Sequence, residues 1–589
     1  PQADFDGGRI GAPFFDRRAL TGTPVSTILT EYSAMLRYFL LCAALLAAAC
    51  NSDKPGGIPG PSPEPSGKDI VDQVSQYDAR PFDGEKRAGV FYEIYVRSFA
   101  DSDGDGIGDL NGVTAKLDYL DDLGVAGIWL LPIYTCDSEH GYDVIDYTAV
   151  NPDYGTLADL ENLVAEAHKR KIRVILDFVP NHTSHYCPWF VEACKSAGSP
   201  YRDFYHFSQT AKPGWIAVPS GTTDWFYQGV FDRSMPDLNY GPAASCEQSG
   251  AFVALTDAAK FWVGKGVDGF RLDAVKHIYD SDTSDENPTW LGKFYSELNA
   301  HFQGKSALGF KDIYMVGECW MATEQMAEYY KGLPALFDFT AWADRLLYAL
   351  KNDHAKWFPK DMIAEREVFA AERPDFIQAT KLSNHDESRA RTEVGGSHAV
   401  SLQRCKMAAA VLLTSVGSPY IYYGEELGFF GDKTEKGGDR NVREPMLWKP
   451  KAEDAERPTW ISSTKNTDTG VGSVAVQAES AASLYNVYRK FMRLRNTYPA
   501  LAEGAIGLPE WFDDASSADK QVMAFYRTAG SEKLLVVHNV SATQCSYAFK
   551  GAVAAPVADM NGVALSSQGD SHTLTMPPYS SIILEMQSR

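Results

Sequence analysis

Three carboxyl side chains stand in this sequence where they could do chemistry together. Each comes at the end of a short apolar run, and the three are Asp273, Glu318 and Asp386. Carboxyls that a site collects can donate protons, accept protons or act as nucleophiles. A single such acid is more typical of a salt bridge or a helix cap, because a buried acid is costly unless it is paired. Three of them favour a functional site, the more so with these neighbours: Arg271, His182 and His385.

The elements that must position these residues are short apolar runs separated by amphipathic stretches. The runs have the length of buried strands and cover residues 90–96, 127–131, 173–178, 269–274, 314–317, 336–339, 379–382 and 420–423. Helical patterns such as 157–169, 256–264 and 406–415 lie between them. Eight strands alternating with helices predict parallel βα units that close into a (β/α)8 TIM barrel. In such a barrel the three acids would meet at the C-terminal ends of the strands.

Composition divides the body of the chain into further domains. The barrel is predicted over residues 86–182 and 251–505. The segment between them, 183–250, is too long for a simple loop and is rich in aromatic residues and proline, so we expect an inserted domain after strand three. From residue 506 to 589 the runs are short and β-rich with Gly, Ser and Asp breaks, which predicts a small antiparallel β-domain.

The first 85 residues are predicted to lie outside the barrel. Residues 35–50 carry one cation, about a dozen apolar residues and small residues at the end, which is typical of a signal peptide and too short for a stable membrane span. Cys50 directly follows Leu-Ala-Ala-Ala and resembles the lipidated cysteine of bacterial lipoproteins; an ordinary signal peptide with an incidental cysteine is the alternative. We interpret residues 1–34 as upstream of the mature protein and the Pro/Gly/Ser-rich residues 51–85 as a tether.

Charge and cysteine content narrow the partners and the compartment. Lysine and arginine number 55 against 77 acids, so the net charge of 55 − 77 = −22 argues against nucleic acid and fits neutral or cationic ligands. From the signal-like segment and Cys50 we expect an exported protein that meets a membrane only through a lipid anchor, at a periplasmic or cell-surface location, or else a secreted one. We also expect a monomer. Export permits disulfides, but spacing leaves their connectivity open, including a Cys187–Cys194 pair.

A separate acidic loop predicts a cation site. Residues 101–109 read Asp-Ser-Asp-Gly-Asp-Gly-Ile-Gly-Asp, which matches the first nine positions of an EF-hand-type loop. The predicted Ca²⁺ ligands are Asp101, Asp103, Asp105, the backbone carbonyl of Ile107, and Asp109. Gly112 stands where such a loop has its bidentate Glu. Because the acids would repel one another without a cation, Ca²⁺ is favoured over a solvated acidic turn.

Eight stretches together resemble the signature regions of the α-amylase family, glycoside hydrolase family 13. They occur in family order and cover residues 139–143, 177–182, 235–239, 269–277, 316–320, 382–387, 417–426 and 443–448. Each stretch alone is moderately specific, and the set is highly specific. The resemblance implies a (β/α)8 barrel, an inserted domain B, a β-sandwich domain C and retaining cleavage of α-glucosidic bonds.

The same resemblance implies roles for individual residues. Asp273 would attack the anomeric carbon, Glu318 would be the acid and then the base, and Asp386 would hold sugar hydroxyls in the distorted ring. Arg271, two residues before Asp273 and on the same strand face, would keep that carboxyl ionised. The substrate contacts would come from Tyr142, His182, His385, Lys276 and His277.

Two motifs point to different members of the family. Lys276-His277 resembles α-amylases, whereas Met235–Asn239 resembles the group between oligo-1,6-glucosidases and neopullulanases. We expect an endo-acting α-amylase on starch or maltodextrins because the first motif bears on the leaving-group side of an α-1,4-glucan. An α-glucosidase, a neopullulanase, a cyclomaltodextrinase or a transglycosylase stays open. A non-catalytic glucan-binding lipoprotein is the alternative from another class, which the three acids disfavour.

Overall fold

The computed structural model describes residues 89–218, 225–279, 284–339, 344–512 and 520–587. The predictions for residues 1–85, including the signal-like segment and Cys50, lie outside these ranges. No helix within the described residues is long and apolar enough to cross a membrane.

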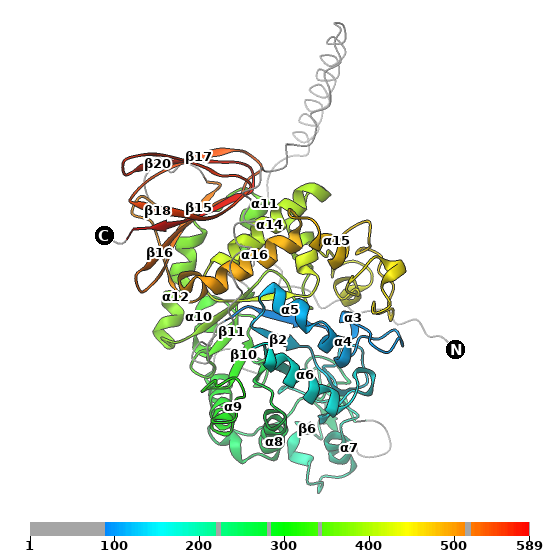
Figure 1. The fold of residues 1–589 in the computed structure, drawn as a ribbon. Helices are drawn as coiled ribbons and strands as arrows, with labels where there is room; N and C mark the ends of the chain where they lie inside the picture. Colours follow the sequence, from blue (N-terminus) through cyan, green and yellow to red (C-terminus); the bar gives the residue numbers. More distant parts are fainter. Residues whose placement is uncertain (1–88, 219–224, 280–283, 340–343, 513–519, 588–589) are drawn as a thin grey trace, which may run out of the picture. The chain divides into compact units, whose positions relative to one another are not determined.

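Eight parallel strands close into a barrel, as predicted. They are β1 (Phe91–Ile94), β2 (Gly127–Leu130), β5 (Arg173–Phe178), β9 (Gly269–Leu272), β10 (Tyr314–Glu318), β11 (Ala335–Phe337), β12 (Ile377–Lys381) and β13 (Ser418–Tyr422). Each strand pairs with the next one along the chain, and β13 pairs with β1 to close the ring. The strands lie inside a layer of helices (Figure 1). Their side chains are buried almost throughout, which explains the continuous apolar runs.

The helices follow the strands and cover the barrel. The longer ones are α6 (Leu157–Lys169), α8 (Gly250–Gly264), α9 (Glu286–Phe302), α12 (Phe358–Glu372), α14 (His398–Thr414) and α16 (Leu484–Thr497). The shorter ones are α3 (Val96–Phe99), α4 (Leu110–Ala115), α5 (Leu117–Leu123), α10 (Thr323–Tyr329), α11 (Asp344–Lys351), α13 (Ala390–Val394), α15 (Val474–Ala478) and α17 (Pro499–Ala502). Helix α6 shows why they form: Thr156 and Asp159 make a capping box, and the buried residues recur at helical spacing.

Two additions extend the loops at the C-terminal ends of the strands. After β2, strands β3 (Tyr134–Cys136) and β4 (Val144–Val150) form a hairpin. After β5 comes the inserted segment, with α7 (Pro188–Lys195), the short strands β6 (Phe207–Ser208), β7 (Ile216–Ala217) and β8 (Phe226–Tyr227), and the 3₁₀ helix η3 (Ala243–Gln248). The three strands make a small sheet of their own, in the order β6–β8–β7. The insertion expected after strand three is therefore present.

The C-terminal region is an antiparallel β-sandwich, as expected. One sheet holds β14 (Ala505–Gly507), β15 (Val522–Ala529), β16 (Glu532–Asn539), β21 (Ser580–Met586) and β18 (Val553–Met560), in that order. The other holds β17 (Cys545–Lys550), β20 (Ser571–Met576) and β19 (Ala564–Gln568). The two sheets lie face to face (Figure 1), and a hydrophobic core that includes Leu535, Tyr547, Leu574 and Ile582 fills the space between them.

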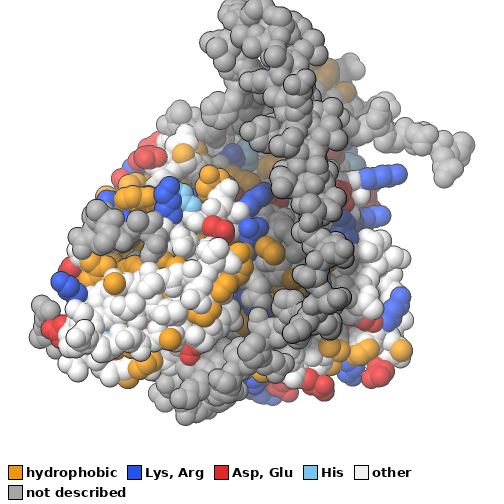
Figure 2. Space-filling model, turned by 90° about the horizontal axis from the view of Figure 1, so that it is seen from above, with side chains coloured by type: hydrophobic (Ala, Val, Ile, Leu, Met, Phe, Trp, Pro, Cys, Tyr) orange, Lys and Arg blue, Asp and Glu red, His pale blue; other side chains and the backbone are white. Residues whose placement is uncertain are grey.

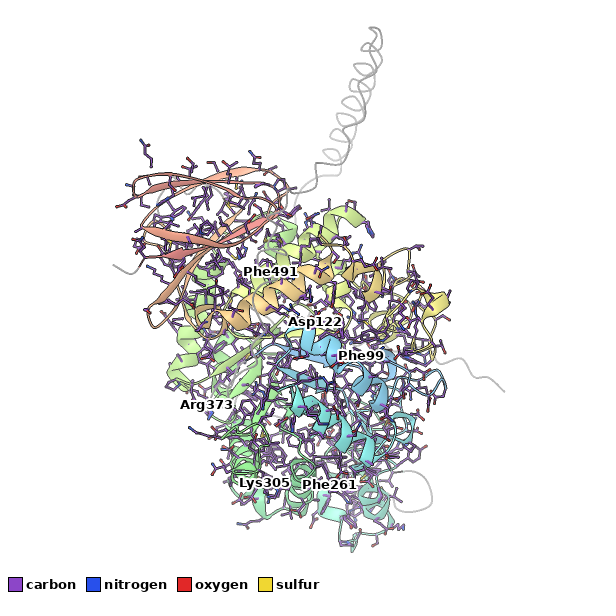
Figure 3. All side chains as sticks on the ribbon, in the orientation of Figure 1. Phe99, Asp122, Phe261, Lys305, Arg373 and Phe491 are labelled. Carbon is purple, nitrogen blue, oxygen red and sulfur yellow. The ribbon has the colours of Figure 1, made fainter. Side chains whose placement is uncertain are left out.

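Helix α16 packs on α5 of the barrel, and α14 contacts the sandwich. Asp122 on α5 accepts from Arg489 of α16 at 2.5 Å and also pairs with Arg493, and Figure 3 labels Asp122 close to Phe491 of α16. At the C-terminal end of α14, the buried Arg527 of β15 donates to the carbonyl of Thr414 at 2.6 Å. The last carbonyls of a helix have no partner within it, so this contact joins the two domains through a helix end.

All seven described cysteines are free thiols, Cys187 and Cys194 included.

On the face shown in Figure 2, basic side chains lie next to acidic ones at several places among the described residues.

Candidate active site

The strand register brings the central polar residues to one end of the barrel. Asp177 of β5 pairs with Arg271 of β9, and Arg271 pairs in turn with Val316 of β10. The next pair along is Leu272 with Gly317, so Asp273 and Glu318 follow side by side at the C-terminal edge. Functional residues of parallel barrels collect at this edge.

One guanidinium contacts three carboxyls there. Arg271 Nη1 lies 2.9 Å from Asp177 Oδ1 and 2.8 Å from Asp273 Oδ1, and its Nη2 lies 2.8 Å from Glu318 Oε2. The side chains of Arg271 and Asp177 are buried, while those of Asp273 and Glu318 are 11% and 12% exposed. The two outer carboxyls are therefore the ones that a ligand can reach.

Two of the carboxyls that share this cation, Asp177 and Asp273, have raised pKa values. Burial raises the pKa of Asp177 to about 6, against the opposing effect of Arg271. Burial also raises the pKa of Asp273; Arg271 lowers it, as expected, but the charges of Glu318, Asp177 and Asp386 add to the effect of burial. Asp177 and Asp273 therefore keep a proton to a higher pH than isolated aspartates do.

Asp386 is held as a carboxylate on the other side of the site. His385 Nε2 lies 2.9 Å from Asp386 Oδ2, and His385 Nδ1 lies 2.7 Å from Glu93 Oε1. Burial lowers the pKa of His385, but the two carboxylates outweigh it and raise that pKa to about 9. The imidazolium, together with Arg443 at 3.1 Å and Lys433, holds the pKa of Asp386 well below its usual range despite burial.

Two further predicted residues line the same site. The Tyr142 hydroxyl lies 2.6 Å from His385 Nε2 and donates to Asp177 Oδ2 at 3.0 Å, so it connects the two halves. His182 is buried, and burial lowers its pKa to about 3, which makes it a neutral imidazole. Within the described residues its Nε2 has no hydrogen-bond partner. A buried nitrogen without a partner is costly unless a ligand completes it.

Lys276 and His277 lie next to this cluster. The turn after β9 positions them, with Ala274 at a φ of 49°, which is unusual for a residue other than glycine. The Ala274 N–H donates to Glu318 Oε2 at 3.0 Å. Lys276 Nζ donates to the carbonyl of Trp320 at 3.4 Å, and the ring of Phe231 packs against both His182 and His277, with centroids 5.3 and 5.1 Å away.

The structure adds residues that the sequence reasoning left without a role. Asp177 interrupts an otherwise apolar strand, and Glu93 does the same in β1, so a charge inside a buried run was the available signal for both. Arg443 belongs to one of the family-like stretches, but its contact with Asp386 spans 57 positions of the chain. Trp320, whose indole donates to Glu318 Oε1 at 2.9 Å, follows Glu318 by two residues.

The acidic loop brings most of its predicted ligands together. Carboxylate oxygens of Asp101, Asp103 and Asp109 lie within 4.8 Å of one another, and Asp105 is outside this group. The Asp105 side chain accepts from the N–H of Ile107 at 2.7 Å instead. None of the ion pairs found among the described residues involves this group, so its charges lack a protein cation.

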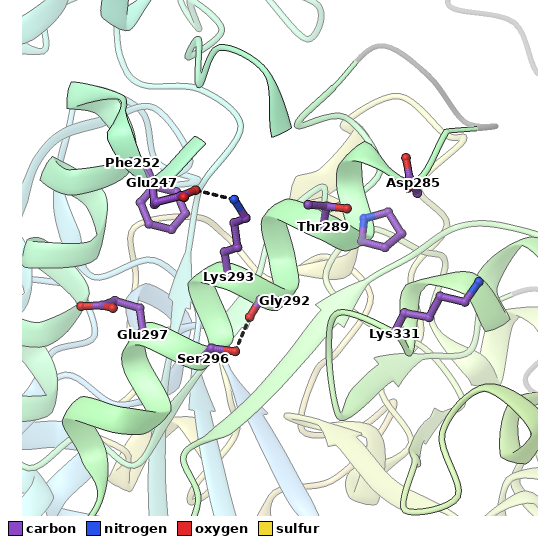
Figure 4. Close-up of a pocket in the computed structure, with 10 residues that line it drawn as sticks. Glu247, Phe252, Asp285, Thr289, Gly292, Lys293, Ser296, Glu297 and Lys331 are labelled. Atoms are coloured by element: carbon purple, nitrogen blue, oxygen red, sulfur yellow. Dashed lines mark hydrogen bonds and ion pairs between the residues drawn. The ribbon is translucent and has the colours of Figure 1, made fainter. Parts of the chain in front are cut away.

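A cavity of about 740 Å³ lies on the outer helices, away from the carboxyl cluster around Arg271 (Figure 4). It lies against η3, α8 and α9, and its lining includes Phe252 and the ion pair between Glu247 and Lys293. No residue of the carboxyl cluster lines it.

The closed (β/α)8 barrel carries two accessible carboxyls on one buried guanidinium at the C-terminal ends of its strands. This arrangement is typical of barrel enzymes that use carboxyl groups in catalysis. The family model described as "Alpha amylase, catalytic domain" matches residues 93–504, and one described as "Alpha-amylase SusG C-terminal domain" matches residues 522–583. The chain belongs to the α-amylase family.

Two curated relatives and a solved structure are similar to this chain over most of its length. "Alpha-amylase SusG" of Bacteroides thetaiotaomicron is 36% identical, over 93% of this chain and 98% of its own. "Alpha-amylase 3" of Dictyoglomus thermophilum is 37% identical, over 84% of this chain and 93% of its own. The crystal structure of an α-amylase from H. orenii superposes with a TM-score of 0.75 at 34% identity, covering 85% of this chain and all of that one.

Proposed function

We propose that this protein is an α-amylase, a retaining hydrolase that cleaves α-1,4-glucosidic bonds in starch or maltodextrins through a covalent glycosyl-enzyme intermediate. The observation that carries this proposal is the placement of two accessible carboxyls, Asp273 and Glu318, on one buried guanidinium. Retaining glycoside hydrolases need two carboxyls about 5–5.5 Å apart, and a shared cation keeps a pair close. Membership of the α-amylase family supplies the substrate class.

In the first half of the reaction, Asp273 attacks the anomeric carbon while Glu318 donates its proton to the leaving oxygen. Arg271 contacts both carboxyls, and its charge favours the ionised form of Asp273. In the second half, Glu318 takes a proton from water, which attacks the intermediate and releases Asp273. Over the two halves, one glucosidic bond is broken, one water molecule is consumed, and both carboxyls return to their starting state.

The remaining polar groups bind the reacting sugar. Asp386, ionised by His385 and Arg443, is suited to accept from sugar hydroxyls and to stabilise the positive charge of the oxocarbenium-like ring. Tyr142 would stack under the ring, and His182, whose Nε2 has no hydrogen-bond partner among the described residues, would hydrogen-bond to it. Lys276 and His277 would contact the sugar beyond the cleaved bond.

The assignment is tested by the products from soluble starch, pullulan and maltotriose. An endo-acting α-amylase releases mixed maltodextrins from starch and leaves the α-1,6 bonds of pullulan intact. Panose from pullulan would favour a neopullulanase, glucose alone an α-glucosidase, and longer products from maltotriose a transglycosylase. Starch that is bound without release of reducing ends would favour the non-catalytic binder.

We also propose that the loop 101–109 binds Ca²⁺ through Asp101, Asp103 and Asp109, with Asp105 and the Ile107 carbonyl as further ligands. The clustered carboxylates are hard oxygen donors, which Ca²⁺ prefers. Removing the ion with EDTA should lower the midpoint of thermal unfolding by several degrees, and added Ca²⁺ should restore it. The Asp103→Asn variant should respond less to EDTA than wild type does. An unfolding midpoint that EDTA leaves in place would contradict this site.

Finally, we propose that the protein is exported and that Cys50 is its lipidated N-terminal residue. The sequence around Cys50 supports this, and residues 51–85 have the composition of a tether. Mass spectrometry of the mature protein from membranes should find diacylglycerol on Cys50, and Cys50→Ala should move the protein to the soluble fraction. A mature N-terminus elsewhere without lipid would contradict the proposal.

A further inference from the structure

A cleft adjoins the active site next to the loop that follows β10. Its volume is about 470 Å³, which lies within the range of roughly 300–1,000 Å³ that small-molecule sites have. Asp386 lines it, and so does Trp320, whose indole N–H donates to Glu318 Oε1 at 2.9 Å. The described residues that line the cleft thus include one of the three acids and a direct neighbour of a second, so the cleft begins beside the place of the reacting sugar.

The position of Trp320 indicates that the cleft lies on the leaving-group side of that sugar. On the proposed mechanism, Glu318 gives its proton to the leaving oxygen, and Trp320 contacts this carboxyl from the cleft. Lys276, the proposed contact of the sugar beyond the cleaved bond, donates through Nζ to the carbonyl of Trp320 at 3.4 Å. A glucan chain that continues past Lys276 therefore leads into the cleft.

Two exposed aromatic residues line this cleft. Tyr348 of α11 is 63% exposed and Trp320 is 39% exposed. Single exposed aromatic residues are common on protein surfaces, but two in one cleft that opens from an active site favour contact with a ligand. Trp320 stacks on Phe339 with ring centroids 4.2 Å apart, so its ring has a fixed place. A glucose ring has an apolar face that can pack on such flat aromatic surfaces.

Helix α11 holds Tyr348 on the barrel while its ring stays accessible. The opposite face of the helix is buried through apolar residues such as Leu346. The carbonyl of Tyr348 accepts from the side-chain amide of Asn352 at 2.8 Å. The carbonyl of Lys351 accepts from Arg404 of α14 at 3.2 Å. Because these contacts satisfy carbonyls at the end of the helix, the backbone that carries Tyr348 is anchored.

The charged residues of the cleft fit an uncharged ligand that is rich in hydroxyl groups. The acids in its lining outnumber the bases, with Asp344, Asp386, Glu387 and Glu393 against Lys351 and Lys433. This excess of negative charge disfavours phosphorylated and other anionic sugars. The side chain of Glu387 is 21% exposed and paired with the buried Lys381, so it is held as an acceptor for sugar hydroxyls.

We propose that Tyr348 is a specificity-determining residue for long α-glucans: the part of the chain that runs from the cleaved bond towards the reducing end enters this cleft, and one of its glucose rings stacks on Tyr348. This inference rests on the proposed function and refines it. Binding energy gained at a distance from the cleaved bond favours cleavage that leaves several glucose residues on the leaving-group side.

The test is the cleavage pattern of maltoheptaose that is labelled with heavy oxygen at its reducing end, because the labelled products are the leaving-group fragments. Tyr348→Ala should release shorter labelled fragments than wild type does. Its kcat/KM on maltoheptaose should fall by about five- to tenfold. On α-maltosyl fluoride, whose leaving group carries no sugar, kcat/KM should stay within about twofold of the wild-type value. A residue that only supports the fold would lower both rates and leave the pattern unchanged.

Three controls accompany this variant. Tyr348→Phe keeps the ring and should keep the wild-type pattern. Trp357→Ala is the matched surface control, since Trp357 is 45% exposed and is not among the described residues that line the cleft, and it should also keep the pattern. The thermal midpoint of Tyr348→Ala should equal that of wild type. If it does not, Tyr348→Gln serves the same test with a residue that favours helices.

An unchanged pattern of labelled fragments in Tyr348→Ala would overturn the inference. Longer labelled fragments would overturn it as well, because they would place the cleft on the other side of the cleaved bond. The proposed function fails separately. It is wrong if Asp273→Asn hydrolyses starch normally, whereas an inactive Asp273→Asn together with an unchanged pattern in Tyr348→Ala overturns only the role of Tyr348.

Discussion

Replacing Asp273 with asparagine should lower kcat on starch by about 10⁴-fold or more. Asparagine has almost the same shape and can still accept from Arg271, but its amide oxygen cannot form the glycosyl ester. The residual rate would come from binding and electrostatics alone. Release of reducing ends by purified wild type and variant, each at matched concentration, measures the loss.

The fold should survive this substitution. Asp273 is one of three acids that share a single guanidinium, so removing one charge relieves repulsion while the bond to Arg271 can remain. We expect an unfolding midpoint equal to or above that of wild type. Asp118→Asn is a suitable control because that side chain is 85% exposed, and it should hydrolyse starch like wild type. Retention of a tenth of the activity by Asp273→Asn would remove Asp273 from the nucleophile role.

Replacing Glu318 with glutamine should have the second largest effect, and the size should depend on the leaving group. On maltodextrins we expect a loss of about 10³-fold, because an amide cannot protonate the leaving oxygen. On α-maltosyl fluoride, whose leaving group needs little protonation, formation of the intermediate should slow by less than about tenfold.

The second half-reaction of Glu318→Gln provides a further check. Without a base, water attacks the intermediate slowly, but azide needs no base and should restore turnover while forming an α-maltosyl azide. The configuration of this product is informative, since two successive inversions leave the α-anomer. Equal losses on both substrates with no effect of azide would show that Glu318 is not the acid/base.

Much of this fold was predictable because the physics behind it is local and repeated. A strand buried on both faces must be almost wholly apolar, so β5 and β10 were visible as short apolar runs in the sequence. Helix α6 was equally visible through its apolar periodicity. The alternation of the two patterns was sufficient to predict the barrel, and the β-rich runs after it predicted the C-terminal domain. The residue boundaries proposed for these domains stay predictions.

The site was predictable in its central residues and not in its contacts. Asp273 and Glu318 stood out as acids at strand ends. The lowering effect of Arg271 on the pKa of Asp273 was expected. The net rise of that pKa was not, because it depends on burial and on how many carboxyls share the cation. The bond between Trp320 and Glu318 and the left-handed backbone of Ala274 left no comparable signal, since packing of separate loops determines both.

The central claim is that Asp273 forms the covalent bond to the sugar, and one measurement tests it directly. The protein is incubated with 5-fluoro-α-maltosyl fluoride, an activated substrate whose ring fluorine slows the second step more than the first, then digested and sequenced by tandem mass spectrometry. The account predicts a fluoromaltosyl ester on the peptide with Asp273, absent from Asp273→Asn. An adduct on Asp386, Glu318 or any other residue, with Asp273 unmodified, would contradict it.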